Sequence, residues 1–367
     1  MSLRQGRPIL VMAGGTGGHV YPALAVARAL QASSREVVWL GTRRGLEARV
    51  VAEAGINIEW IRVRGLRRTG VLALIIAPLQ LGWALLQSLV VIFRHRPAAV
   101  LGMGGFVSGP GGVAAWLTRR PLVIHEQNAA AGMTNRLLAR LARVVLQAFP
   151  GSFNSSVVAQ TVGNPVREDI TAVSPPAERY GNRVGPLRLL VLGGSQGALA
   201  LNRTVPAALA LLGAELRPQV RHQCGERTLQ AARDAYVEHG VQADLLPFIE
   251  DMAGAYAWAD LVVCRAGALT VAELCAAGLP ALFVPYPGAV DDHQTANARP
   301  MADAGAAAIM QESDLTPESL ASLLREWLQS RALLTKSAEI ARSLACPNSL
   351  RRITEICISQ AQSGAPA

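Results

Sequence analysis

The stretch Ile9-Leu-Val-Met-Ala-Gly-Gly-Thr-Gly-Gly-His19 decides the fold class of this chain of 367 residues. Its apolar start is typical of a buried strand, and the glycines that follow at once are typical of a tight turn into a helix. The same order returns as Leu189-Leu-Val-Leu-Gly-Gly-Ser-Gln-Gly197 in the second half of the chain. Two such openings, one in each half, predict a weak duplication at the level of a domain.

Short apolar runs alternate with helical patterns along both halves. We expect strands at 9–13, 37–40, 98–101, 122–124 and 144–146, and again at 187–192, 220–223, 244–248, 261–264 and 281–284. Strands that alternate with helices predict an α/β fold, in which helices cover both faces of parallel sheets. The turn residues of Gly163-Asn-Pro-Val-Arg167 mark a boundary. We therefore expect one domain over 1–165 and a second over 166–345, followed by residues 346–367.

The charges are unevenly distributed. Residues 1–166 contain 18 arginines and 5 glutamates, a net charge of +13, whereas the rest of the chain has 17 cationic and 21 acidic residues, a net charge of −4. A basic half predicts an anionic partner, which is a nucleic acid, a membrane surface or a phosphorylated substrate. A general preference for arginine explains the lack of lysine but not the lack of acids. Since no nucleic-acid-binding motif accompanies the charge, we expect no nucleic acid partner.

The cysteines and the N-terminus indicate the compartment. Five cysteines are scattered along the chain without the spacing of a zinc site, so we expect reduced thiols of a cytosolic protein and no metal. The apolar run 9–13 is too short for the core of a signal peptide, so we also expect no export signal.

Residues 71–93 carry no charge and are flanked by arginines on both sides. By length alone this segment could span a bilayer. However, Pro78, Gln80 and Gly82 interrupt it, and the alternation of strands and helices requires a crossover helix here. Helical spacing gives that helix a face of small residues, such as Ala77 and Ala84, and a bulky apolar remainder.

A helix that packs one face on its own sheet leaves the bulky face exposed, and a large exposed apolar surface marks an interaction site. With arginines nearby, this predicts a helix that lies in a membrane interface; a core helix and a true span are the alternatives. The residues that we expect at the membrane are Ile75, Leu79, Trp83, Leu86, Arg67 and Arg68.

Three glycine-rich turns follow predicted strands, at 14–19, 102–109 and 193–197. Backbone N–H groups at such turns, together with a helix N-terminus, favour phosphate. The first turn does not fit the dinucleotide fingerprint, because Val20 stands where its third glycine belongs and Arg43 and Arg44 replace the expected acid. An NADP site is therefore a weak alternative. We expect a phosphorylated ligand in a cleft between two similar domains.

Four groups of polar residues follow predicted strands. His19 stands at a helix N-terminus, which keeps its ring neutral and able to accept a proton, unless it only caps the helix. The motif 125–128 (His-Glu-Gln-Asn) favours ligand recognition over a solvated loop. Residues 267–270 can start a helix that binds a diphosphate, with Glu273 on ribose hydroxyls or merely on the helix dipole. The motif 291–297 can hydrogen-bond a sugar.

Taken together and in order, these motifs resemble those of the MurG family of peptidoglycan glycosyltransferases over nearly the whole chain. The matching stretches are Gly14–His19, Gly102–Pro110, His125–Asn128, Gly163–Arg167, Gly193–Gly197, Arg265–Glu273 and Asp292–Gln294. The resemblance implies a GT-B fold, in which two Rossmann-like parallel-sheet domains face each other across a cleft. It also implies that the helix within 346–367 packs back on the first domain, with a frayed tail.

The family's reaction is the transfer of N-acetylglucosamine from UDP-N-acetylglucosamine to lipid I, which is undecaprenyl-pyrophosphoryl-N-acetylmuramoyl-pentapeptide. The resemblance therefore implies an inverting transferase that acts on the 4-hydroxyl of the muramoyl sugar and makes lipid II for the cell wall. It implies a peripheral protein at the cytoplasmic face of the bacterial inner membrane, active in cell shape and division. No cofactor is implied; other cell-wall synthesis and division proteins are further partners.

The resemblance also assigns residues, with the donor on the C-terminal domain and the acceptor and membrane on the N-terminal one. It puts Ser195 and the helix start 267–270 at the diphosphate, Glu273 on the ribose, and Arg167 and Ile249 around uracil. The full donor set is Thr16, Gly17, Gly18, Asn128, Arg167, Ser195, Ile249, Gly267, Ala268, Leu269, Thr270, Glu273 and Gln294. The acceptor set is Gly14, Gly15, Gly104, Gly105 and Asn135. His19 is the expected catalytic base, and Glu126 is the reserve.

Two other functions compete with this interpretation. A related lipid glycosyltransferase, such as one that acts on diacylglycerol, would share the fold, the donor turns and the membrane helix. A non-catalytic membrane scaffold that binds a nucleotide sugar would lack a catalytic candidate, whereas His19 and Glu126 are both present.

Overall fold

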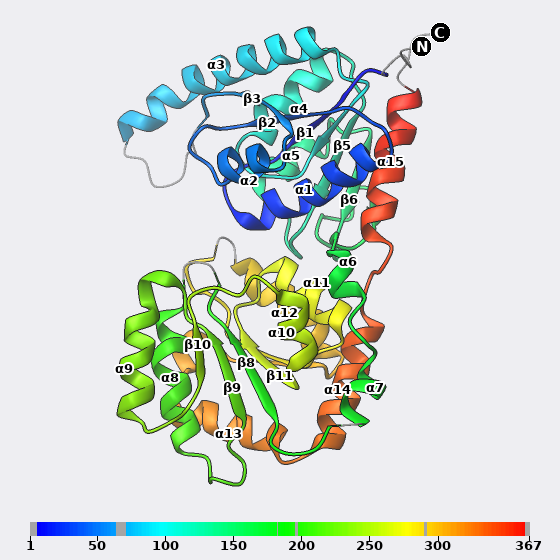
Figure 1. Ribbon diagram of the computed structural model, residues 1–367. Helices are drawn as coiled ribbons and strands as arrows, with labels where there is room; N and C mark the ends of the chain where they lie inside the picture. Colours follow the sequence, from blue (N-terminus) through cyan, green and yellow to red (C-terminus); the bar gives the residue numbers. More distant parts are fainter. Residues whose placement is uncertain (1–5, 64–70, 182, 195–196, 290–291, 364–367) are drawn as a thin grey trace. The chain divides into compact units, whose positions relative to one another are not determined.

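The computed structural model describes residues 6–63, 71–181, 183–194, 197–289 and 292–363 (Figure 1). The chain divides into two compact units. The first comprises Met1–Pro165 together with Asn348–Ala367, and the second comprises Val166–Pro347. The chain thus leaves the first unit after Pro165 and returns to it for its last helix.

The first unit is built on a parallel sheet with the strand order β3-β2-β1-β4-β5-β6-β7. Its strands are β1 (Ile9–Met12), β2 (Val37–Gly41), β3 (Asn57–Trp60), β4 (Ala99–Gly102), β5 (Leu122–Glu126), β6 (Val144–Gln147) and β7 (Ala159–Thr161). Its helices are α1 (Gly17–Ala32), α2 (Glu47–Glu53), α3 (Val71–His95), α4 (Ser108–Leu117), α5 (Met133–Leu138) and α15 (Ser349–Ser363).

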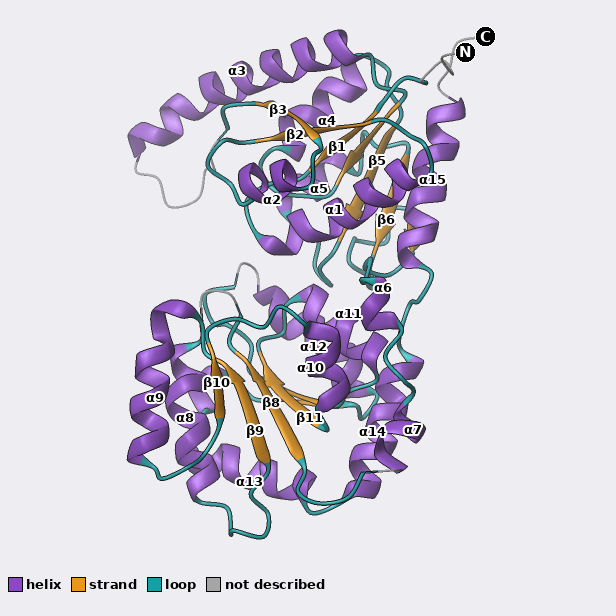
Figure 2. Ribbon diagram, viewed as in Figure 1, coloured by secondary structure: helices purple, strands orange, loops and turns teal. Residues whose placement is uncertain are grey.

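Helices cover both faces of this sheet, because successive side chains of a strand point to opposite sides (Figure 2). In β1, Ile9 and Val11 belong to the core that includes buried residues of α1 and α15. Leu10 and Met12 belong to the opposite core, which includes residues of α3, α4 and α5. Helices α1 and α15 pack against each other on the first of these faces.

The second unit repeats this plan with the strand order β10-β9-β8-β11-β12-β13, again all parallel. Its strands are β8 (Arg188–Leu192), β9 (Gln219–Gln223), β10 (Asp244–Leu246), β11 (Leu261–Cys264), β12 (Ala281–Phe283) and β13 (Ala307–Ile309). Its helices are α6 (Glu168–Thr171), α7 (Pro176–Gly181), α8 (Leu199–Ala210), α9 (Leu229–Glu238), α10 (Met252–Trp258), α11 (Ala268–Ala277), α12 (His293–Asp303), α13 (Pro317–Leu328) and α14 (Arg331–Ser343), with short 3₁₀ turns at Glu226–Thr228 and Glu312–Asp314.

The α/β class expected from the sequence is confirmed, and every predicted strand is present with ends shifted by at most two residues. The structure adds three strands that the pattern does not predict, namely β3, β7 and β13. All three lie at sheet edges.

Helix α3 is the crossover connection from β3 to β4, as its place in the sequence predicts, and it packs against α4. Its buried face consists of small and aliphatic residues, including Ala84, Ser88 and Ile92. The Ser88 hydroxyl donates a hydrogen bond to the Ala84 carbonyl oxygen, so this polar group is satisfied inside the helix.

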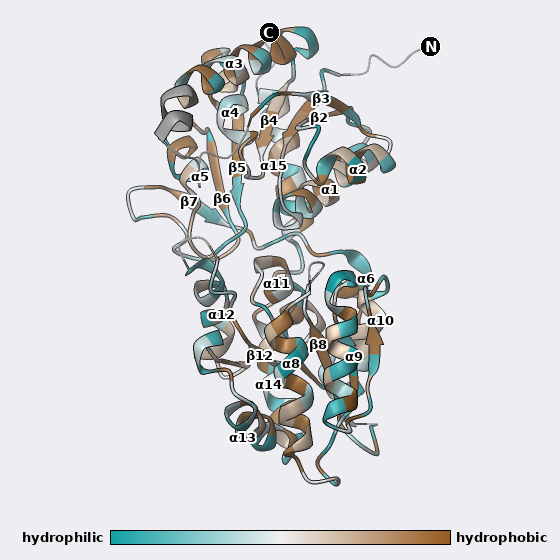
Figure 3. Cartoon of the chain, turned by 90° about the vertical axis from the view of Figure 1, so that its left-hand side faces the viewer, coloured by the Kyte–Doolittle hydropathy of each residue, from teal (hydrophilic) through white to brown (hydrophobic). Residues whose placement is uncertain are grey.

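Figure 3 colours hydrophobic residues along α3 brown. The face opposite to the buried one exposes large apolar side chains. Leu79 is 75% exposed, Trp83 56% and Leu86 55%. The stretch Ala77–His95 is long and apolar enough to cross a membrane, with a mean hydropathy of 1.3, but only 28% of it is buried. A core helix of a soluble protein would be mostly buried, so the core alternative is disfavoured. Arg67, Arg68 and the side chain of Ile75 lie outside the described residues.

Candidate active site

The first glycine turn lies at the carboxyl end of β1 and leads into α1. Gly15 has a φ of +95°, a left-handed conformation that favours glycine, and Thr16 caps the helix in an extended conformation. Gly17, Gly18 and His19 form the first helical turn. The His19 amide donates to the Thr16 carbonyl oxygen at 3.1 Å, whereas the amides of Gly17 and Gly18 come before the first such bond of the helix, which suits them to bind an anion.

Glu47 holds this turn in place, a role that no sequence motif indicates. Its side chain is fully buried at the start of α2. One carboxylate oxygen accepts from the Gly15 amide at 3.1 Å, and the other accepts from the amide and hydroxyl of Thr42 at 2.9 and 2.7 Å. The first glycine turn is therefore tied to the end of β2. The scarcity of acids in this half of the chain was the only available signal.

The second glycine turn packs directly on the first. The Met103 amide donates to the Met12 carbonyl oxygen at 2.8 Å. A Cβ on Gly105 would overlap the carbonyl oxygen of Gly14, and one on Gly104 would lie 2.7 Å from Nδ1 of His19. Both glycines also have positive φ angles. Only glycine at these positions allows the two turns to meet.

His19 is half-buried and contacts the third motif of this unit. Its Nδ1 lies 3.1 Å from Oε1 of Gln127, and Nε2 of Gln127 donates to the Met103 carbonyl oxygen at 3.0 Å. The structure thus brings together three stretches that the sequence analysis singled out, namely 14–19, 102–109 and 125–128.

Glu126 serves the loop that follows β5. It is 2% exposed, and its carboxylate accepts hydrogen bonds from the Asn128 amide, the Asn128 side chain, the Gly132 amide and the Asn135 side chain at 2.8–3.1 Å. A carboxylate that is buried and engaged four times is poorly placed to take a proton from a substrate. These contacts favour a role of Glu126 in shaping the loop, and its assignment as the reserve base stays a prediction.

Asn135 and His125 are also engaged within the protein. Asn135 is 2% exposed, and its side-chain amide donates to the His125 carbonyl oxygen as well as to Glu126. This arrangement favours a structural role for Asn135 over contact with the acceptor. The His125 ring contacts the Gly163 carbonyl oxygen at 2.9 Å, and burial lowers its pKa to about 4. Asn128 is half-buried at the start of the loop.

In the second unit, the expected helix start is present. Gly267 is the N-cap of α11, and Ala268, Leu269 and Thr270 form its first turn. Both backbone groups of the preceding residue, Ala266, are hydrogen-bonded to α12. Its amide donates to Oε1 of Gln294 at 3.2 Å, and its carbonyl oxygen accepts from the Asn297 side chain at 3.1 Å.

Gln294 stands near the start of α12, where its carboxamide oxygen also accepts from the Tyr286 amide at 2.9 Å. These two hydrogen bonds to Oε1 fix the orientation of the Gln294 side chain. Neither of them involves the carboxamide nitrogen. The motif predicted to bind sugar therefore also shapes the turn between β11 and α11.

Glu273 lies one turn into α11 and is half-buried. Its carboxylate accepts a hydrogen bond from the Tyr256 hydroxyl at 2.9 Å. Burial raises the pKa of Glu273, and the Tyr256 hydroxyl and the charge of Arg167 oppose that rise. Arg167 caps α6, which packs against α11, so a cation and an anion lie near each other at this end of the unit. Ile249 is buried in the loop before α10.

The third glycine turn retains its glycine geometry on either side of Ser195, which lies outside the described residues. Gly194 and Gly197 have φ angles of +76° and +74°, and the Gly193 amide donates to the Gln223 carbonyl oxygen at 3.0 Å.

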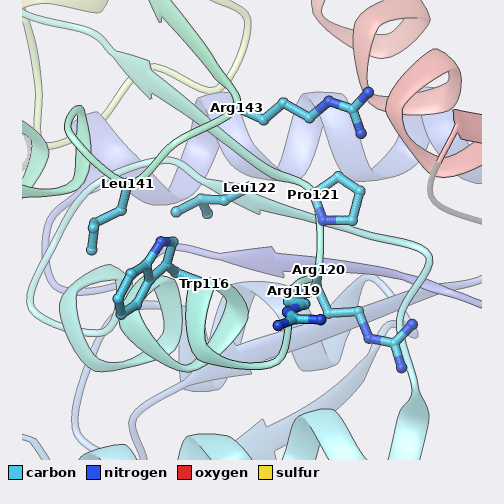
Figure 4. Close-up of a pocket in the computed structure, with 7 residues that line it drawn as sticks. All are labelled: Trp116, Arg119, Arg120, Pro121, Leu122, Leu141 and Arg143. Carbon is cyan, nitrogen blue, oxygen red and sulfur yellow. The ribbon is translucent and has the colours of Figure 1, made fainter.

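A cavity of about 250 Å³ lies in the first unit near the start of β5, away from the candidate residues at the end of that strand (Figure 4). It is lined by Trp116, Arg119, Arg120, Pro121, Leu122, Leu141 and Arg143. Burial and the charges of Arg7 and Arg96 lower the pKa of Arg120, so several cations gather here. Over the ranges of the chain that the structure describes, no group of three His, Cys, Asp or Glu residues could hold a metal ion.

Comparisons with known proteins agree with this arrangement. Residues 9–147 match the model of the glycosyltransferase family 28 N-terminal domain, and residues 188–346 match that of the C-terminal domain. The crystal structure of MurG from Acinetobacter baumannii superimposes with a TM-score of 0.85 at 42% identity, covering 96% of this chain and 99% of that one.

Two curated relatives share the printed name UDP-N-acetylglucosamine--N-acetylmuramyl-(pentapeptide) pyrophosphoryl-undecaprenol N-acetylglucosamine transferase. The one from Alkalilimnicola ehrlichii is 59% identical, covering 97% of this chain and 99% of the relative. The one from Marinobacter nauticus is 54% identical, covering 97% and 98%. With its two Rossmann-like parallel-sheet units, the chain therefore belongs to the MurG family within glycosyltransferase family 28.

Proposed function

We propose that the chain transfers N-acetylglucosamine from UDP-N-acetylglucosamine to N-acetylmuramyl-(pentapeptide) pyrophosphoryl-undecaprenol. The observation that carries this proposal is the 59% identity, over 97% of the chain, to a relative of that name. The geometry supports it, because each unit has a glycine-bounded helix start suited to an anion. The relatives at 59%, 54% and 55% identity all have this name, which favours it over the competing function of a diacylglycerol glycosyltransferase.

In this proposal the reaction is a direct displacement with inversion. The 4-hydroxyl oxygen of the muramoyl sugar bonds to the anomeric carbon of N-acetylglucosamine as the bond from that carbon to the UDP oxygen breaks. UDP leaves with the bonding electron pair, and the hydroxyl proton passes to Nε2 of His19. The support for His19 is its half-buried position beside the first glycine turn, and the four hydrogen bonds on Glu126 favour His19 over Glu126 as the base.

On the donor side, the negative charge that develops on UDP needs fixed donors. The amides of Leu269 and Thr270 suit this task because they stand in the first turn of α11. We assign Glu273 to the ribose hydroxyls, since a carboxylate near a diphosphate is unfavourable unless it binds something else. Gln294, through its carboxamide nitrogen, is assigned to the sugar. We retain Arg167 and Ile249 for uracil and Ser195 for the diphosphate on the family resemblance alone.

The acceptor is a lipid, so we also propose that the protein works at the cytoplasmic face of the inner membrane as a peripheral protein. The exposed face of α3 supports this, as does α4, which packs against α3 and exposes Trp116 and Leu117 by about half. Figure 4 shows Trp116 beside Leu122 and Leu141, in a pocket that Arg119, Arg120 and Arg143 also line. An apolar surface with cations beside it is suited to anionic lipids. Roles in cell shape and division, with partner proteins of those processes, belong to the same proposal.

A transfer assay tests this proposal: the purified protein is incubated with radiolabelled UDP-N-acetylglucosamine and either lipid I or diacylglycerol. We expect label in the lipid fraction only with lipid I, and calorimetric titration should show weaker binding of other UDP-sugars. Transfer to diacylglycerol instead would identify the related lipid glycosyltransferase. Donor binding without transfer to either lipid would identify a non-catalytic scaffold.

A further inference from the structure

The ring of His19 is held from two sides by residues with no charge. The backbone of Gly104 lies close against the ring, and the carboxamide of Gln127 lies 3.1 Å from Nδ1. The second contact is directional, because a carboxamide has a donor end and an acceptor end. Which end faces His19 decides which ring nitrogen carries the proton.

The orientation of the Gln127 carboxamide is fixed by its other partner. Its Nε2 lies 3.0 Å from the carbonyl oxygen of Met103, which can only accept a hydrogen bond. Turning the carboxamide around would place two oxygens against each other there and an N–H group against Nδ1. Gln127 is 1% exposed, and its backbone carbonyl accepts from Asn164 at 3.0 Å, so the whole residue is held.

The oxygen of Gln127 therefore faces His19, and this oxygen can only accept. Nδ1 must then carry a hydrogen. In a neutral imidazole one nitrogen is the donor and the other has the lone pair, so the lone pair lies on Nε2. When Nε2 takes up a proton, the Nδ1–H bond to Gln127 persists, and no side chain needs to move.

We propose that Gln127 is a positioning residue that fixes the tautomer of His19 and so makes Nε2 the proton-accepting atom. This inference rests on the proposed function in so far as His19 is the base of the transfer. The proposed role of Gln127 also involves the second glycine turn in catalysis, because the Met103 carbonyl oxygen of that turn holds the Gln127 side chain in place. It also divides the His-Glu-Gln-Asn motif between a loop-forming carboxylate and a ring-positioning carboxamide.

The direct test is the ¹⁵N resonance of the His19 ring in protein labelled on its six histidines, with the signals of residue 19 identified by their loss in His19→Ala. We expect the neutral wild-type ring to carry its hydrogen on Nδ1. In Gln127→Met, which keeps the length of the side chain but removes the acceptor, we expect both tautomers to be populated. Gln127→Glu loses the hydrogen bond to the Met103 carbonyl oxygen, but a carboxylate oxygen can still accept from Nδ1 and none can donate to it, so we expect the wild-type tautomer to be retained.

Kinetics provide the second readout. Gln127→Met should lower kcat on the order of 10-fold or more, with KM for the donor within about 2-fold, because only the proton transfer is affected. Gln127→Glu should recover part of the loss. The matched control is Gln147→Met, a buried glutamine of the same unit that donates to the Thr161 hydroxyl and should change neither tautomer nor kcat.

The outcomes separate this inference from the proposed function. A wild-type ring with its hydrogen on Nε2, or an unchanged tautomer in Gln127→Met, overturns the positioning role. If Gln127→Met fails to fold, the wild-type spectrum and Gln127→Glu still decide. If the tautomer behaves as expected but His19→Ala transfers sugar at the wild-type rate, then the assignment of His19 as the base fails and that of Gln127 as the tautomer-fixing residue stands.

Discussion

Two buried carboxylates organise loops of the first unit. The hydrogen bonds that each of them accepts come from groups of the protein itself. Glu47 collects donors from Gly15 and Thr42, and Glu126 collects them from the loop after β5. Residues 1–166 have only 5 acids against 18 arginines, so the burial of two acids leaves the surface of this unit even more basic than its composition suggests. That basic surface is consistent with an anionic lipid environment.

We expect Glu47→Gln to destabilise the first unit by about 1–3 kcal/mol, because the new NH₂ group must face backbone and hydroxyl donors that need an acceptor. Since the first glycine turn loses an anchor, kcat should fall as well. Chemical denaturation with a tryptophan fluorescence readout measures the stability. The matched control is Glu53→Gln, an exposed residue at the end of the same helix, which should stay within about 0.5 kcal/mol. Equal stability of the two variants would show that the Glu47 contacts contribute nothing.

The sequence predicted the neighbourhood of His19 better than the roles within it. The turns after β1 and β4 and the motif after β5 were each expected to follow a strand, and they lie together because parallel strands end at the same edge of a sheet. The hydrogen bond from the Gly15 amide to Glu47 could not be predicted, since it depends on how the loop after β2 folds over Gly15. Likewise, the contacts of Glu126 with the loop 128–135 could not be predicted, because they form only when that loop folds around the carboxylate.

The fully buried strands were all predicted, and the three strands that were missed are partly exposed edge strands; β10 is a partly exposed edge strand that was predicted. β1 and β11 are buried at every position and therefore appear as continuous apolar runs. The edge strand β3, with the sequence Asn-Ile-Glu-Trp, is only half-buried, and β7, with Ala-Gln-Thr, is similar. Such short mixed segments have no periodicity that distinguishes them from loops.

Helix α3 shows how one helix can satisfy two environments. Its small residues let it approach α4 closely, and its bulky residues are left on the outside. The variant Leu79→Ser with Trp83→Ser and Leu86→Ser should bind anionic vesicles at least about 10-fold more weakly, because apolar area no longer enters the interface. Vesicle sedimentation measures this.

The control for the α3 variant removes exposed apolar residues from the other unit. Leu211→Ser with Val237→Ser changes side chains that are 49% and 81% exposed, and it should leave vesicle binding unchanged. Equal loss in both variants would mean that binding depends on general hydrophobicity rather than on α3. Vesicle binding that resists high salt and carbonate extraction would indicate a true span.

Each unit has its own sheet and its own core, and each also contains one fully buried histidine. His125 lies at the end of β5, where it contacts the Gly163 carbonyl oxygen. His222 lies in β9, where its Nδ1 is 3.1 Å from the Tyr236 hydroxyl. Burial lowers the pKa of His125 to about 4 and that of His222 to about 3, from an ordinary value of 6.5. The two units are therefore expected to lose stability in the same direction as the pH falls.

The direction follows from proton binding. Below about pH 6.5 the unfolded chain protonates these histidines while the folded units do not, so stability is full at neutral pH and is lost as the pH falls from about 6.5 toward 4. The loss at the acid end is on the order of 3 kcal/mol for each histidine. Hydrogen exchange on peptides of β5 and β9 follows each unit separately. His222→Asn should flatten the pH dependence of β9 and leave that of β5 unchanged, whereas His239→Asn, at the partly exposed end of α9, should alter neither. A pH dependence of β9 that survives in His222→Asn would assign the acid sensitivity of the second unit to other groups.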